Sequence, residues 1–204
     1  MKLAKVLLKD WINYVDEELA ENLIQKLDLI YNDSEVYPYK NKVFRVFQEL
    51  SPEDTKVILL GMDPFHNLYK GEPSACGRAF ATENGYLNPS LRNLLKELKD
   101  DMGIDEKDYS LQPWVDRGVL LLNTALTVEA GKPGSHIELW KPFMKSLIPN
   151  IKDKTWVLLG ANAQSWEPYI NGNIIKAAHP SPLARGKFFG SKIFSKIWKT
   201  ELKT

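Results

Sequence analysis

The sequence predicts an α/β fold in which a central parallel, doubly wound sheet of four strands is covered by helices. Four short apolar runs, at residues 57–62, 118–122, 156–159 and 173–178, each stop at a polar residue or a glycine. Runs of this length with such boundaries are typical of strands buried on both faces. Stretches with helical spacing of apolar residues lie between them, and this alternation indicates a doubly wound sheet.

Length and composition suit one domain that spans residues 1–204. Of the 204 residues, 44% are hydrophobic and 26% are charged, which allows a sizeable core. The formal net charge is only +1, so nucleic-acid binding would need a local basic face. The single cysteine, Cys76, excludes an intrachain disulfide and fits the reducing cytoplasm. We expect neither a signal peptide nor a membrane span, because Lys5 and Lys9 interrupt the apolar N-terminal stretch.

The remaining elements follow from spacing. Apolar residues recur every three or four positions through residues 7–15, 19–27 and 43–47, which predicts three helices that cover the sheet. The long connection from residue 67 to Ser90 reads as irregular, and connections of this length are usually functional or mobile. A helix is predicted from Ser90, which could be its N-cap or a phosphate contact at its N-terminus. Two further helices are predicted at residues 139–148 and 163–169.

Polar side chains stand where the predicted strands end. Asp63, Asn123 and His179 come directly after apolar runs, and parallel strands bring such residues to one edge of the sheet. The other histidines, His66 and His136, also lie in loops near strand ends. A metal site, acid/base hydrolysis and stabilisation of a leaving anion are the possible roles. Because a metal needs three or four ligands in tight geometry and no such pattern is present, we expect no metal.

Six segments resemble family 1 uracil-DNA glycosylases, in the same order along the chain. GMDPFH at Gly61 is similar to the family's GQDPYH, and HPSPLA at His179 is similar to its HPSPLS. The other four are GVLLLNTALTVEAGKPGSH, GRAF, NPSL and GKFFGSKIFSK. The likeness runs from about Val36 to Ile197. It implies the three-layer α/β fold of this family, with a four-stranded parallel sheet between helices.

The resemblance also implies an activity. The family are monofunctional hydrolases of DNA repair that flip uracil out of DNA and hydrolyse its N-glycosidic bond without metal or cofactor, leaving an abasic site. By this likeness Asp63 is the catalytic carboxylate, which orients the attacking water and favours positive charge on the sugar. His179 is the second catalytic residue and donates a hydrogen bond to the departing uracil anion, as an oxyanion hole does.

Base and DNA contacts are implied in the same way. Asn123 pairs with the uracil edge, Phe80 stacks on the base, Phe65 crowds C5 to exclude thymine, and Met62 contacts the pocket through its backbone. The implied DNA contacts are Pro89, Ser90, Ser181, Leu183, which enters the base stack, and Arg185. The implied partners are single- or double-stranded DNA containing uracil and a proteinaceous inhibitor that mimics DNA. We expect a monomer.

The chain departs from the family pattern around the first strand. Met62 replaces glutamine, Phe65 replaces tyrosine, Asn67 replaces glycine, and the loop after His66 is longer. These changes leave an alternative open: a DNA-binding protein of the same fold with weak activity, or with specificity for a modified uracil. His136 matches a histidine of the family near the DNA, but it could equally hydrogen-bond within its own loop.

Overall fold

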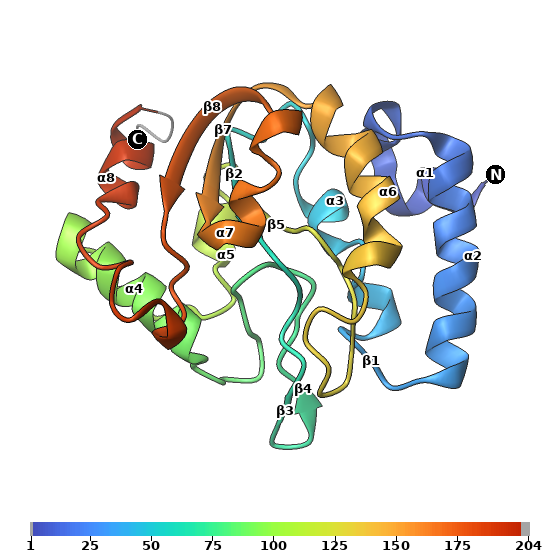
Figure 1. Cartoon of the computed structure of the whole chain (residues 1–204), viewed down its shortest axis with the longest axis horizontal. Helices are drawn as coiled ribbons and strands as arrows, with labels where there is room; N and C mark the ends of the chain where they lie inside the picture. Colours follow the sequence, from blue (N-terminus) through green and yellow to red (C-terminus); the bar gives the residue numbers. More distant parts are fainter. Residues whose placement is uncertain (1, 201–204) are drawn as a thin grey trace.

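A four-stranded parallel sheet forms the centre of the protein (Figure 1), as the sequence predicts; the computed structural model describes residues 2–200. The strands are, in spatial order, β5 (Val119–Asn123), β2 (Val57–Gly61), β7 (Lys152–Leu159) and β8 (Asn171–Ala177). Each strand pairs with its neighbour in parallel. Both β7 and β8 begin before the apolar runs, because exposed polar residues extend their amino ends.

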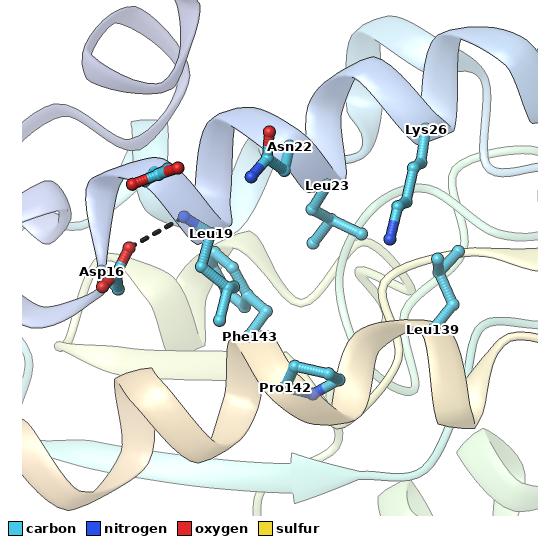
Figure 2. Close-up of a pocket in the computed structure, with 9 residues that line it drawn as sticks. Asp16, Leu19, Asn22, Leu23, Lys26, Leu139, Pro142 and Phe143 are labelled. Carbon is cyan, nitrogen blue, oxygen red and sulfur yellow. Dashed lines mark hydrogen bonds between the residues drawn. The ribbon is translucent and has the colours of Figure 1, made fainter.

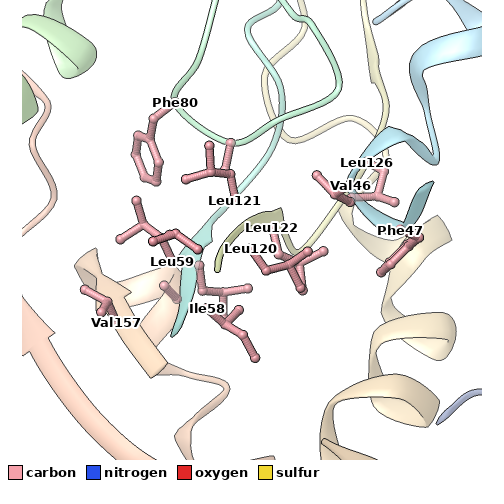
Figure 3. Close-up of a cluster of buried hydrophobic side chains, with 14 of the residues drawn as sticks. Val46, Phe47, Ile58, Leu59, Phe80, Leu120, Leu121, Leu122, Leu126 and Val157 are labelled. Carbon is pink, nitrogen blue, oxygen red and sulfur yellow. The ribbon is translucent and has the colours of Figure 1, made fainter. Parts of the chain in front are cut away.

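Successive side chains of the central strands pack on opposite faces of the sheet. β2 and β5 are buried along their whole length. Leu120 and Leu122 point towards α3 (Arg45–Glu49), whereas Leu121 between them lies on the side of Phe80 (Figure 3). This alternation is the two-residue period of a strand. Most of the interior is one apolar cluster whose members run from Ala4 to Ile197, and a second, small cluster lies apart from it.

Helices cover both faces. They are α1 (Leu3–Leu8), α2 (Glu17–Asp33), α3, α4 (Pro89–Met102), α5 (Gln112–Val115), α6 (Ile137–Leu147), α7 (Gly160–Gln164) and α8 (Ile193–Thr200), with 3-10 turns at Lys9–Tyr14, Lys40–Lys42, Ile148–Asn150, Glu167–Tyr169 and Pro182–Ala184. In Figure 1, α4 and α8 lie to one side of the sheet, and α1, α2, α3 and α6 lie to the other. None of the helices in residues 2–200 has the length and apolar character that crossing a bilayer requires.

The entry to α4 corrects one prediction. Ser90 is not the N-cap: the Asn88 side chain accepts a hydrogen bond from the Ser90 N–H at 2.8 Å, and Pro89 is the first helical residue. Asparagine caps a helix well because its short side-chain oxygen reaches the free N–H groups of the first turn. The Ser90 hydroxyl is therefore not needed as the cap of this helix.

The connection that the sequence predicts to be irregular contains a hairpin. β3 (Leu68–Tyr69) pairs with β4 (Glu72–Pro73), and the hairpin projects from the lower edge of the molecule in Figure 1. The two turn residues, Lys70 and Gly71, have φ of 53° and 82°, as in the tight turns that suit hairpins. A second short pair joins β1 (Val36–Tyr37) to β6 (Val128–Glu129) in antiparallel fashion.

Candidate active site

A pocket of about 770 Å³ lies at the carboxyl edge of the sheet. Residues that end or follow each of the four strands line it: Asp63 after β2, Asn123 at the end of β5, Asn162 after β7 and His179 after β8. Phe80, from the connection between β4 and α4, completes this group. The structure thus brings together residues that are far apart in the sequence, at the edge where the prediction placed them.

A second hollow, of about 390 Å³, lies between α2 and α6 (Figure 2). Leu19 and Leu23 of α2 face Pro142 and Leu139 of α6 across it, and the Lys26 side chain extends over the same gap. The strand-end pocket instead combines a carboxylate, an imidazole, amides and an aromatic ring. Because polar groups of different chemistry that converge in one pocket mark a reaction site, we take the strand-end pocket as the candidate active site.

Asp63 is held by the loop that precedes α6. Its Oδ2 accepts a hydrogen bond of 2.6 Å from the Gly134 N–H, while the neighbouring Gly131 N–H donates to the His66 carbonyl at 2.8 Å. Burial raises the pKa of the Asp63 carboxyl above its ordinary value, against the opposing effects of the Gly134 N–H and of His66. Asp63 forms no ion pair with any of the described residues, so its carboxylate is held by backbone N–H groups rather than by a cation.

His179 has a defined proton position. Its Nδ1 lies 3.0 Å from the Ser181 backbone nitrogen, which can only donate, so Nδ1 accepts and the ring proton resides on Nε2. Burial lowers the pKa of His179, which favours the neutral ring. The Phe80 ring lies against it, with centroids 5.9 Å apart and planes inclined by 43°. His179 is therefore a neutral hydrogen-bond donor at the wall of the pocket.

Asn123 sits at the junction between β5 and β2, and it is only 6% exposed. It pairs with Gly61, where a Cβ would lie 2.3 Å from the Asn123 Oδ1, so the missing side chain makes room for the amide. The junction is closed beyond this point by the Met62 carbonyl, which accepts from the Ala125 N–H at 2.9 Å and from the Thr124 hydroxyl at 2.8 Å. These bonds fix the amide against the pocket.

Phe80 has a strained backbone, which is supported by an ion pair between the buried Arg78 and Glu49 at the surface. Its φ is 65°, a left-handed value that is uncommon for a bulky residue. Two residues earlier, Arg78 is 4% exposed, donates twice to the Glu49 carboxylate at 2.8 Å, and donates to the Ser110 carbonyl at 2.7 Å. The Arg78 Nη2 also donates to Gln112. This anchoring fixes the segment that presents the Phe80 ring to the pocket.

Two of the three residues that depart from the family pattern, Met62 and Phe65, line the pocket, and Asn67 does not. Met62 and Phe65 flank Asp63 and belong to its wall. Phe65 also packs against a small apolar cluster made of Tyr37, Ala75 and Val128. Its ring is thus supported from behind by β1 and β6, the short strands that the sequence did not predict.

The predicted DNA contacts divide into two groups. Ser90, Ser181 and Leu183 line the pocket, and Leu183 is 91% exposed. The Ser181 hydroxyl accepts from the Leu183 N–H at 3.1 Å, which shapes the turn. Pro89, which opens α4, and Arg185, which ends the turn with φ of 49°, lie outside the lining of the pocket.

The other two histidines are placed differently. His66 lies in the turn after β2 and lines the pocket. The His136 Nδ1 lies 2.9 Å from the Thr127 hydroxyl, which also accepts from the Trp140 indole N–H at 2.7 Å. Since the indole is an obligate donor and Thr127 is fully buried, the hydroxyl proton goes to Nδ1 and the His136 proton lies on Nε2. Hydrogen bonding close to its own loop is thus part of what His136 does.

Asn162 and Gln164, which line the pocket, and Gly134, which supports Asp63, were not predicted from the sequence. Asn162 and Gln164 follow β7 as Asp63 follows β2, so a polar residue after a strand was an available signal for them. Gln164 donates to the Ala177 carbonyl at 2.9 Å and ties α7 to the end of β8. Gly134 contributes only its backbone N–H to Asp63, for which the sequence offers no signal beyond a loop that contains glycines.

Comparison with known proteins shows the family of this chain. The sequence model of the uracil DNA glycosylase superfamily matches residues 47–200. Uracil-DNA glycosylase of Streptococcus gordonii is 39% identical over 201 residues, which cover 91% of this chain and 90% of that protein. The protein of the same name from Campylobacter fetus is 40% identical over 209 residues, with 95% and 88% covered.

Solved structures give the same result. A mimivirus UNG variant in complex with UGI matches with a TM-score of 0.79 and 28% identity over 88% of this chain and 73% of that chain. UNG from Nitratifractor salsuginis, at 22% identity, shares the fold with a TM-score of 0.64 over 98% and 97% of the two chains. From the pocket, the family match and these relatives together, the chain belongs to the uracil DNA glycosylase superfamily.

Proposed function

We propose that this protein is a DNA repair glycosylase that flips uracil out of DNA and hydrolyses its N-glycosidic bond, leaving an abasic site. The observation that carries the proposal is the meeting of Asp63, Asn123, His179 and Phe80 in one pocket at the sheet edge. A base inside a duplex cannot reach such groups, so the nucleotide must leave the stack before it reacts. The names of the bacterial relatives support uracil as the base.

The reaction divides between the two catalytic residues. As the glycosidic bond breaks, its electron pair moves to the uracil ring and positive charge develops on the sugar. Asp63, ionised and partly buried, stabilises that charge, orients the water whose oxygen bonds to the sugar carbon, and accepts the proton that this water loses. His179 donates from Nε2 to the uracil O2, where negative charge collects. Neither role needs a protonated imidazole.

Specificity for the base comes from the Asn123 amide and the rings of Phe80 and Phe65. The Asn123 amide offers one donor and one acceptor to the uracil edge, whereas cytosine presents the reverse pattern and would leave buried groups unpaired. Phe80 stacks on the flipped base, and Phe65 occupies the place where a methyl group on C5 would collide. Met62 contributes backbone to the same wall.

The DNA backbone and the partners complete the proposal. Ser90 and Ser181 hold phosphates, with Pro89 and Arg185 beside them, and Leu183 fills the space that the flipped base leaves. The protein acts as a monomer, without metal or cofactor. The UGI complex of a structural neighbour supports a proteinaceous inhibitor that mimics DNA, and the bacterial relatives support a cytoplasmic site of action.

One assay tests this function against its alternative. We expect release of free uracil from a single-stranded oligonucleotide that contains one uracil, and no release of base from matched strands with cytosine or thymine. Because Met62 and Phe65 change the pocket wall, a 5-substituted uracil is included. Faster release of the substituted base would favour the specificity alternative, and binding without any release would contradict the proposed activity.

The pH dependence follows from the two pocket groups. Raising the pH ionises Asp63, whose pKa is raised by burial, so activity rises through a pH above the usual range of an aspartate. The neutral form of His179 is the donor and its pKa is lowered, so this residue causes no loss towards neutral or basic pH. We expect kcat/KM to rise and reach a plateau when measured from about pH 4 to pH 9. A fall in the neutral range would contradict these roles.

A further inference from the structure

Three polar side chains recur along one face of α4, at Asn93, Glu97 and Asp101. Residues four apart on a helix lie one above the other, so the three form a single stripe. Each bonds to the C-terminal segment that begins after β8: Asn93 donates to the Pro180 carbonyl at 2.7 Å, and Asp101 accepts from the Ser195 N–H at 2.7 Å. We call these three residues the α4 clamp.

Glu97 is the centre of the clamp. It is 1% exposed, and its carboxylate accepts hydrogen bonds from the Gly190 N–H at 2.8 Å, the Lys192 N–H at 2.9 Å and the Ser191 hydroxyl at 3.3 Å. Burying a carboxylate costs free energy unless such donors satisfy it. An apolar residue would be enough to pack this face of α4. The carboxylate does more, because its hydrogen bonds fix the path of the backbone at Gly190.

The clamp holds both ends of one loop and leaves its tip free. Asn93 fixes the end at Pro180, and Glu97 fixes the end at Gly190. Between them Leu183 is 91% exposed. The same helix places Ser90 at the pocket, so α4 sets the position of the loop relative to the pocket.

We propose that Asn93 and Glu97 of the clamp are positioning residues that hold the 181–189 loop so that Leu183 enters the base stack at the flipped nucleotide, while Asp101 holds the start of α8 beyond it. The inference rests on the proposed function. A loop with both ends fixed loses less conformational freedom when its tip inserts, because part of the ordering precedes binding. Insertion matters where a base must leave a stack, so the clamp acts mainly on duplex DNA.

The test compares kcat/KM on duplex and single-stranded uracil DNA for Glu97→Gln. The variant keeps the size of the side chain but turns an acceptor oxygen into an amide donor, which must face a backbone N–H. Since small misplacements of a functional group reduce rates strongly, we expect about a tenfold fall on duplex and less than about a twofold fall on single strands. Asp100→Asn is the matched control, because Asp100 lies on the exposed face of α4, paired with Lys96.

A double variant separates positioning from general stabilisation. Leu183→Ala lowers the duplex rate, and Glu97→Gln added to it lowers that rate no further if the clamp acts through Leu183. An equal loss on both substrates, or additive losses, would overturn the inference. If Glu97→Gln does not fold, Asn93→Ala, at the other end of the loop, takes its place. The same comparison of kcat/KM on duplex and on single-stranded DNA then applies. Wild type that releases no uracil from single strands would instead contradict the proposed function.

Discussion

Asp63→Asn is expected to lower the rate of uracil release by a factor of about 10² to 10⁴, the range found when a positioned acid or base is removed. The substitution keeps the shape of the side chain, and its oxygen can still accept from the Gly134 N–H. It removes the negative charge that faces the sugar. Single-turnover release from a uracil oligonucleotide measures the loss. Activity within about threefold of wild type would contradict a catalytic role.

The same variant has a second expected effect, on stability. The pKa of Asp63 is raised in the folded protein, so its stabilising contribution exists below the pKa of the unfolded chain and is lost as pH rises through the folded value. At neutral pH the ionised carboxylate is therefore a cost, and Asp63→Asn should keep or raise Tm. Asp153→Asn, at the exposed amino end of β7, is the control and should leave the rate unchanged. A lower Tm for Asp63→Asn would show that the carboxylate stabilises the fold.

Gly160→Ala is expected to displace the His179 imidazole and so to lower kcat, although His179 itself is unchanged. A Cβ at Gly160 would lie 2.8 Å from the His179 Cβ and 3.3 Å from its Cδ2, so the imidazole must move. Removing one preorganised donor to a developing anion costs about 10² to 10³ in kcat. We expect a loss of this size, with KM changed much less, in steady-state assays on a uracil oligonucleotide.

Backbone strain needs its own control in this experiment. Gly160 has φ of 87°, which an alanine adopts at a cost of about 1–2 kcal/mol. Gly103, at the end of α4, has φ of 72° and nothing within 4 Å of its missing Cβ. Gly103→Ala should therefore lower Tm with little effect on kcat. Equal kcat values for the two variants would show that the position of His179 does not limit the reaction.

The fold could be predicted from the sequence because buried strands appear as continuous apolar runs. β2 and β5 are apolar throughout and end at Gly61 and Asn123, so both their existence and the edge that carries the site could be predicted. The family motifs then predict Asp63 and His179 as the catalytic residues. The ends of the strands and the short strand pairs were harder to predict. β3 and β4 have two residues each, which is too few to show an alternation of apolar and polar residues.

The supporting contacts were not accessible, for a physical reason. A backbone N–H is the same at every residue, so nothing marks Gly134 as the donor to Asp63 or Gly190 as the donor to Glu97. The choice of Asn88 rather than Ser90 as the cap of α4 was equally hidden, since both residues are good caps and only the backbone path decides. Long-range geometry, not local preference, selects these partners.

The two hydrogen bonds accepted by the Met62 carbonyl bear on how the enzyme can change over time. Both bonds that close the junction between β2 and β5 go to the backbone of this residue, from Ala125 and Thr124. Substitution of the side chain leaves the junction intact. Position 62 can therefore carry a polar or an apolar side chain while Asp63 and Asn123 keep their places, because the bonds at this junction do not involve that side chain.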